Sequence, residues 1–254
     1  MAEVIRSLDW SSTPLGAIET WPQSLRTTVN LSLASNFPIC IVWGPQYTQI
    51  YNDSYRIICG EKHPAAMGMA YNQCWKDAWS AIGQSFNNAL KGVTSFLENQ
   101  RIFLFRNGYL EETFFTFSLS PIRDESGGIG GLFHPVTETT ATMVGARRNR
   151  AVLDLTARLG NAETTPEVFQ LAVKTLAKFD LDVPFVVLYK LDKEAQVYRL
   201  TGFTGIDGDT CLNPAVLPLD HAGIWPMAHL LHQSKFAQIS GIRTHLGGYT
   251  LWTL

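Results

Sequence analysis

The clearest hydrophobic pattern of the chain lies between residues 111 and 139. Apolar and polar residues alternate from Phe115 to Leu119, with the period of two that is typical of a half-buried strand. At 123–128 the chain reads Arg-Asp-Glu-Ser-Gly-Gly, where Asp and Ser can bond the local backbone and glycine allows a positive φ. A second apolar strand follows at 129–136. The pattern therefore predicts a long β-hairpin.

Shorter elements are expected before this hairpin. Five strands joined mostly by tight turns predict an antiparallel sheet, with the helices gathered between the second and third strands on one face. The fold class is therefore α+β. In chain order, the expected elements are a helix over about 20–34, strands at 39–43 and 48–51, short helices at 55–58 and 64–67, a long helix at 73–90, and strands at 94–97 and 100–105.

Beyond residue 139 the pattern becomes helical. An uninterrupted helix is expected to Leu159, with Val152, Leu155 and Leu159 as a short apolar seam and arginines on the other faces. A second helix is expected to begin at Thr165 as its cap, with Pro166 in its first turn. Strands are then expected at 183–192 and 197–203, a helix at 225–232 and a strand at 236–239, while 243–254 has no clear assignment.

Composition and charge narrow the classes of protein. The 254 residues suffice for one large domain or two ordinary ones. A formal net charge of −2 without a basic block argues against nucleic acid as the main partner. The longest apolar runs are too short to span a bilayer, and the N-terminus lacks a basic-then-apolar signal pattern. A cytoplasmic protein without a membrane span is therefore predicted.

The four cysteines show no CxxC spacing, and neither a disulfide nor a zinc role is favoured. Three of them lie in apolar contexts, where a reduced Cys behaves as a small hydrophobe. The four cysteines of the chain are Cys40, Cys59, Cys74 and Cys211.

Several of these stretches resemble a known family. The run at 120–132, SPIRDESGGIGGL, with its Val-Thr-Glu-Thr exit at 136–139, resembles the C-terminal hairpin of PAS sensor domains. Trp43-Gly44 followed by Tyr-Asn-Asp-Ser-Tyr at 51–55 is similar to the first PAS hairpin and the helix after it. The lead-in, with Asp9-Trp10 and Trp21-Pro22, resembles the extension that precedes such domains in bacterial sensor histidine kinases. The likeness covers about residues 7–140.

The exit departs from the family pattern. PAS domains commonly leave the last strand through Asp-Ile-Thr, whereas this chain has Thr137-Glu138-Thr139. The resemblance implies an ionic contact of that aspartate, which here is missing or moved to Glu138.

Residues 161–254 resemble the first part of a GAF domain, mainly by the order of their elements. The strands that complete such a domain are lacking, and unpaired sheet edges would remain. We therefore expect a fragment or a truncation of a longer signalling protein, followed in the parent by a histidine-kinase region. The expected organisation is an N-terminal helical extension at 1–36, a PAS domain at 37–138, a linker helix at 139–160 and a partial GAF-like domain at 161–254.

A PAS-type sheet encloses a core that either holds a ligand or is filled. Aromatic side chains with a few polar tips suit a small-molecule pocket, but they suit a filled core equally well, and the filled core is favoured. The candidate wall is Cys40, Val42, Tyr51, Tyr55, Trp79, Phe103, Phe115 and Phe117.

Other chemistry finds little support in the sequence. Flavin photochemistry needs a Cys in an Asn-Cys-Arg context, which Cys59 and Cys74 lack, and His63 and His134 fit surface or core positions better than a haem ligand. No phosphate-loop spacing and no Gly-x-Ser-x-Gly elbow occurs. No cofactor, metal or catalytic residue is predicted, and this chain is not expected to be an enzyme. A solvated helix face is favoured over a metal site for His221, His229 and His232.

The leading hypothesis is a sensory input module of a bacterial signal-transduction protein. It would perceive a small ligand or a partner and act as a homodimer through the 139–159 helix, with a kinase or other output domain downstream. The alternative is a dimerisation or docking module whose sealed core binds nothing, and an unrecognised enzyme comes third. The expected relay residues are Thr137, Glu138, Thr139, Val152, Leu155 and Leu159.

Overall fold

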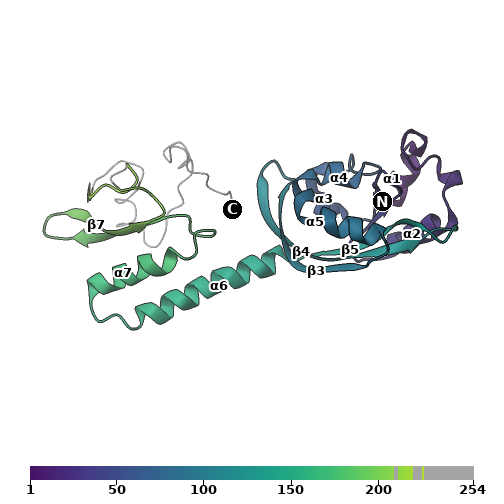
Figure 1. The fold of residues 1–254 in the computed structure, drawn as a ribbon. Helices are drawn as coiled ribbons and strands as arrows, with labels where there is room; N and C mark the ends of the chain where they lie inside the picture. Colours follow the sequence, from purple (N-terminus) through teal and green to yellow (C-terminus); the bar gives the residue numbers. More distant parts are fainter. Residues whose placement is uncertain (209–210, 220–224, 226–254) are drawn as a thin grey trace. The chain divides into compact units, whose positions relative to one another are not determined.

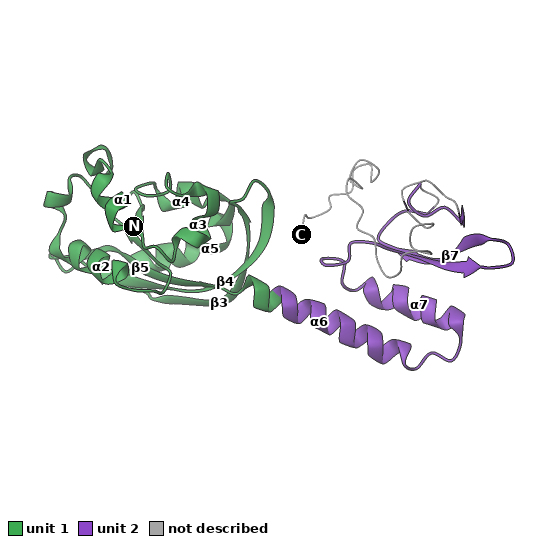
Figure 2. Ribbon diagram, turned by 180° about the vertical axis from the view of Figure 1, so that it is seen from behind, with its two compact units in different colours: residues 1–143, 253–254 green, residues 144–252 purple. Residues whose placement is uncertain are grey.

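A computed structural model describes residues 1–208, 211–219 and 225 (Figure 1). They form two compact units that divide between Met143 and Val144 (Figure 2), and each unit is described by itself. The expected helix at 225–232 (apart from Trp225), the strand at 236–239, the 243–254 tail and the histidines at 221, 229 and 232 lie outside the described residues.

The first unit contains a five-stranded antiparallel sheet in the order β2-β1-β5-β4-β3. This sheet, with the helices inserted between its second and third strands, confirms the predicted PAS-like α+β fold class. The β4–β5 hairpin turns as expected, because Gly127 has φ +84° and the Asp124 carboxylate accepts hydrogen bonds from Ser126 and Gly128. The strands are β1 (Ile39–Trp43), β2 (Thr48–Tyr51), β3 (Ser95–Phe105), β4 (Leu110–Arg123) and β5 (Ile129–Glu138).

One face of the sheet packs against helices. Phe115, Phe117 and Leu119 of β4 are buried there, as their alternation predicts. Helix α5 packs against β3, β4 and β5, and Figure 1 shows the strands bending around this helical layer. The helices are α3 (Arg56–Cys59), the 3₁₀ helix η3 (Gly60–Lys62), α4 (Tyr71–Cys74) and α5 (Lys76–Leu90).

Three local predictions were wrong. The helix expected at 64–67 is a series of turns that follow the short η3 helix. The helix expected at 73–90 is broken at Trp75, whose φ of −110° and ψ of 36° are not helical. The two strands expected at 94–97 and 100–105 form one strand, β3, with a bulge between Leu97 and Gln100.

The N-terminal segment belongs to the core of this unit. All five residues of β1 are buried, so both of its faces are covered, and α2 contacts β1 and β2. Trp10 and Trp21 meet edge to face with ring centroids 4.9 Å apart, and Leu25 of α2 is fully buried in the same cluster. The elements are α1 (Ala2–Ser7), which was not predicted, 3₁₀ helices η1 (Trp10–Ser12) and η2 (Ile18–Thr20), and α2 (Gln23–Leu33).

Asn52 ties these layers together. Its side-chain amide donates to the carbonyls of Ser32, Ser35 and Phe37, at 2.7–3.1 Å. Its Oδ1 accepts from the backbone N–H groups of Ile39 and Tyr55. One buried side chain therefore joins the end of α2, the start of β1 and the start of α3.

The second unit contains most of α6 (Thr140–Leu159) together with α7 (Thr165–Leu176) and a three-stranded antiparallel sheet. Thr164, and not Thr165 as predicted, caps α7 through its side chain. Helix α7 packs on β6 (Val186–Asp192) and β7 (Val197–Thr204), and β8 (Val216–Pro218) was not predicted. None of the described helices combines the length and the apolar character that crossing a bilayer needs.

Candidate functional site

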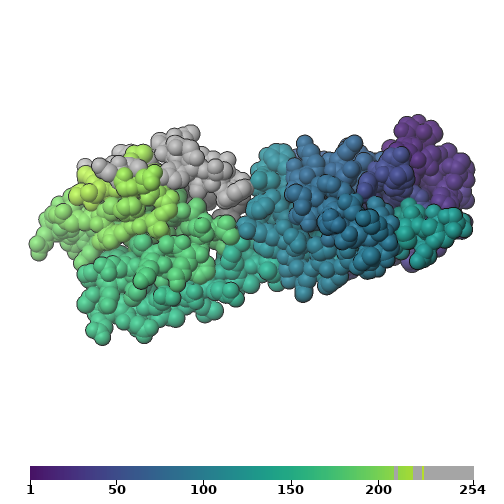
Figure 3. All heavy atoms as spheres, viewed as in Figure 1, coloured from purple at the N-terminus to yellow at the C-terminus, as the bar shows by residue number. Residues whose placement is uncertain are grey.

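A small cavity lies between the helices and the sheet of the first unit. Its volume is about 30 Å³, which exceeds the space of one water molecule but is about a tenth of an ordinary ligand pocket. Figure 3 shows one face of the unit as a surface of packed side chains. The lining residues of this core cavity are Tyr55, Ile58, Tyr71, Trp75, Ala78, Ile82, Ile102, Leu104, Phe115, Phe117, His134 and Val136.

His134 supplies the most polar group of the wall. Its Nδ1 lies 3.0 Å from the Ser118 carbonyl, which can only accept, so Nδ1 carries the proton. Nε2 is then free to accept from the Tyr71 hydroxyl at 3.2 Å. Burial lowers the pKa of His134 to about 4, because the charged ring would lose its solvation. The cavity is therefore lined by neutral groups at neutral pH.

The three cysteines near this core stay thiols. Cys40, Cys59 and Cys74 are buried and free. Burial, reinforced by the neighbouring Cys74 thiol, raises the pKa of Cys59 to about 12. Within 1–208, 211–219 and 225, no three His, Cys, Asp or Glu side chains gather closely enough to hold a metal ion.

The structure places three of the eight predicted wall residues on the cavity: Tyr55, Phe115 and Phe117. Trp79 packs instead against Tyr47 and Phe86. Phe103 lies on the opposite face of β3 from Ile102 and Leu104, beside the Arg101 guanidinium 4.9 Å from its ring centroid. The remaining three are fully buried in the core without lining the cavity: Cys40, Val42 and Tyr51.

Sequence reasoning missed most of the wall. Ala78 and Ile82 share one face of α5, so the helical period could have identified them. Ile102 and Leu104 could be assigned only once the bulge in β3 was known. His134 was considered only as a haem ligand or a surface or core residue, although it alternates with Leu132 and Val136 on the inner face of β5.

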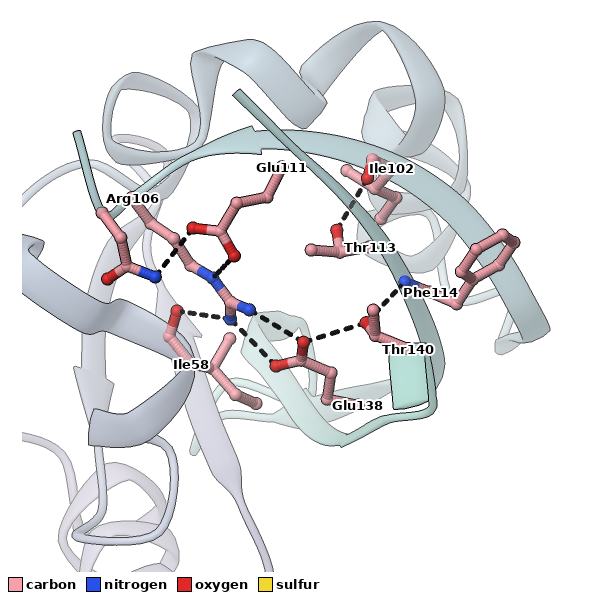
Figure 4. Close-up of polar contacts among 9 residues, drawn as sticks. Ile58, Ile102, Arg106, Glu111, Thr113, Phe114, Glu138 and Thr140 are labelled. Carbon is pink, nitrogen blue, oxygen red and sulfur yellow. Dashed lines mark hydrogen bonds and ion pairs between the residues drawn. The ribbon is translucent and has the colours of Figure 1, made fainter. Parts of the chain in front are cut away.

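A second polar cluster closes the same core where β5 ends (Figure 4). The guanidinium of Arg106, whose side chain is 8% exposed, donates to both carboxylate oxygens of Glu138 at 2.8 and 2.9 Å. Its Nε donates to Glu111 at 3.2 Å. The Thr140 hydroxyl donates to Glu138 at 2.9 Å. We call Arg106, Glu111, Glu138 and Thr140 the exit cluster.

The departure of the Thr137-Glu138-Thr139 exit from the family pattern left open whether the ionic contact is missing or has moved to Glu138. Glu138 makes this contact, with Arg106. The exit cluster also binds the start of α6 to the sheet. The N–H of Phe114 donates to the Thr140 hydroxyl oxygen at 3.0 Å, and the N–H of Thr139 donates to the Phe114 carbonyl at 2.7 Å. No residue between β5 and α6 is therefore left as a free linker.

Two residues of the cavity wall adjoin the exit cluster. Ile58 lines the cavity, and its carbonyl accepts from Arg106 at 3.3 Å. Phe115 lines the cavity, pairs with Glu138 across the sheet, and has its ring centroid 6.0 Å from the Arg106 guanidinium carbon. These contacts connect the cavity wall with the groups that hold the first residues of α6.

The other predicted relay residues lie apart from this cluster. Thr137 faces solvent, and the Thr139 hydroxyl is buried without a hydrogen-bond partner in the described structure. On α6, Val152 is 63% exposed, while Leu155 and Leu159 are half-buried. The three do not form one equally exposed seam.

Comparisons with known proteins find only distant structural likeness. A scan against protein families and a search of curated proteins gave no match. An RNA-binding light-oxygen-voltage receptor aligns at 12% identity and TM-score 0.38, over 57% of this chain and 42% of its own length. The Rhodobacter sphaeroides LOV protein aligns at 11% identity and TM-score 0.40, over 61% of this chain and 93% of its own. A sensory box sensor histidine kinase from Vibrio cholerae aligns at 16% identity and TM-score 0.30, over 45% of this chain and 87% of its own. At these scores nothing is transferred to this chain.

Proposed function

We propose that the chain is a sensory input module of a signalling protein, in which the packing of the first unit's core controls α6 through the exit cluster. The observation that carries this proposal is the pair of residues, Ile58 and Phe115, that belong to the cavity wall and also contact Arg106 or pair with Glu138. A shift of either residue changes the contacts of the partly buried Arg106–Glu138 ion pair, whose strength depends on its geometry.

The dimensions of the core cavity restrict the signal. Its volume of about 30 Å³ is too small for a flavin or a haem, and both ring nitrogens of His134 already have partners. The signal is therefore a ligand of water or diatomic size, or a contact with another protein.

The closed core also favours a second candidate, a docking module that binds no ligand. Native mass spectrometry of the purified chain separates the two candidates. A retained small molecule supports ligand sensing, whereas an empty core supports docking.

The relay itself can be tested inside the chain. Val136→Ile adds one methylene to the cavity wall, and we expect it to change the hydrogen exchange of amides 141–151 in α6. In an Arg106→Met background the same change should leave that exchange unaltered, because the connection is cut. The control is Val29→Ile, which adds the same methylene at a buried position of α2 and should not affect α6. Equal responses in both backgrounds would refute the relay.

Further proposals concern the parent protein, the second unit and self-association. We propose a cytoplasmic bacterial sensor histidine kinase with a kinase or other output domain downstream, and a partial GAF-like identity for the second unit. We also propose a homodimer through the exposed side of α6, where Val152 and Leu153 are 63% and 69% exposed. Val152→Asp should weaken self-association in sedimentation at micromolar concentration, and an unchanged profile argues against this interface.

A further inference from the structure

Among the residues that the structure describes, β3 forms an unpaired edge of the first unit's sheet. At the opposite edge, β2 is covered by the segment at 68–71: Gln49 donates to the Met69 carbonyl and Tyr71 to that of Tyr47. In the described part of the chain, β3 pairs only with β4, although it is eleven residues long. A long edge with unpaired N–H and C=O groups can add a further strand.

The bulge changes which residues of β3 share a face. Leu97 pairs with Phe117 and Gln100 with Phe115, so β3 uses one residue more than β4 between them. As a result, Phe96 and Glu98 before the bulge lie on the same outer face as Arg101 after it. Phe96 is 67% exposed, and Glu98 and Arg101 are exposed as well.

The sequence of β3 is self-complementary about the bulge. Counted outward from the midpoint between Asn99 and Gln100, Glu98 stands opposite Arg101 and Leu97 opposite Ile102. One step further, Phe96 stands opposite position 103, which is also aromatic. Two antiparallel copies in this register would place each charge against its opposite, and the apolar residues at 96 and 97 against those at 103 and 102.

We propose that the β3 edges of two copies of this chain pair antiparallel about a two-fold axis between Asn99 and Gln100. This contact is isologous, since each Glu98 meets the Arg101 of the other copy. In a regular strand, residues on one face are an even number of positions apart. Two copies related by a two-fold axis pair residues that lie on the same face, so the numbers of two paired residues must sum to an even value. The extra residue in each β3 allows the odd sum that this register requires.

Charges and bulges commonly protect edge strands from pairing. Here they select one register. If the copies slide by two residues, Glu98 stands opposite either Asn99 or Phe103, and Arg101 opposite Phe96 or Gln100. Both charges then lose their partners.

Charge reversal tests the contact. Self-association is measured by sedimentation velocity on the full 254-residue chain. All variants also carry Val152→Asp, which removes the proposed α6 contact, so the measurement reports on the β3 contact alone. Glu98→Arg and Arg101→Glu should each weaken self-association about tenfold, the scale of two exposed ion pairs turned repulsive. Lys91→Glu, an exposed reversal just before β3, should have no effect.

Mixing the two single variants provides the decisive comparison. One chain then carries arginine at both positions and the other glutamate at both, so the mixture should associate at least as well as the Val152→Asp chain. The double variant Glu98→Arg/Arg101→Glu should also recover. Arg101→Glu loses the ion pair between Arg101 and Glu112, whereas Glu98 makes no ion pair in the described part of the chain. If Arg101→Glu misfolds, Glu98→Arg therefore still tests the contact. A monomeric Val152→Asp chain, or a mixture no better than its components, overturns the proposal.

Discussion

Acidification should destabilise the first unit through His134. In the unfolded chain this residue has a pKa near its ordinary value of 6.5, whereas burial lowers its pKa in the folded unit to about 4. Between these values the unfolded chain binds a proton that the folded chain does not, so the free energy of unfolding falls as pH falls. The full effect by pH 4 is about 3 kcal/mol, and about 2 kcal/mol of it is lost between pH 7 and pH 5.

Urea unfolding at pH 7, 6 and 5, followed by the fluorescence of the buried tryptophans, measures this loss. His134→Gln, which keeps a neutral amide in place of the ring, should flatten the dependence over that window. Asp124 and Glu125 also have a lowered pKa through hydrogen bonds from Ser126 and Ser24, but their contributions are lost only below about pH 4.5. His63 has a lowered pKa of the same sign at a more accessible site, so His63→Gln is the matched control and should keep most of the slope. A slope that persists in His134→Gln would refute the reasoning.

Four further outcomes are expected in stability measurements. Asn52→Ala should cost about 4 kcal/mol of unfolding free energy, since five hydrogen bonds are lost; a loss below about 1 kcal/mol would contradict its tying role. A double-mutant cycle of Arg106→Met and Glu138→Gln, measured by urea unfolding, should give a coupling free energy of about 1–3 kcal/mol; additive losses would show that the two side chains do not stabilise each other. Thr139→Val should be neutral or stabilising in thermal melts, because the hydroxyl it removes has no partner in the described structure, and a large loss would reveal one. Phe86→Ala, at a fully buried ring, should cost about 3–5 kcal/mol, and a xenon or benzene titration should detect the space left beside Tyr71 and His134.

The sheet could be predicted where one of its faces meets solvent. The alternation from Phe115 to Leu119 is clear because the intervening residues Thr116 and Ser118 are only half-buried. In β1 both faces are covered, so the sequence there is uniformly apolar and does not show which side faces the helices. The break at Trp75 was hidden for a similar reason, since apolar spacing continues on both sides of it.

The site was less predictable because its contacts depend on register. Arg106 and Glu138 are 32 residues apart, and they meet only because β3, β4 and β5 pair in one particular alignment. The bulge near Asn99, whose φ is +48°, moved Phe103 away from the face assigned to it. No local pattern marks an asparagine as the insertion point, because Asn also occurs in ordinary turns.

Direct hydrogen bonds from β4 set the orientation of the first turn of α6. Because Thr139 and Thr140 are held by Phe114, the sheet sets the direction in which the first residues of α6 leave β5. Each residue inserted or deleted within α6 would turn the remainder of the helix by about 100° and move it by about 1.5 Å. If the chain works as proposed, an insertion in α6 would therefore change which side chains of that helix meet a partner, without any change in the sheet or its core.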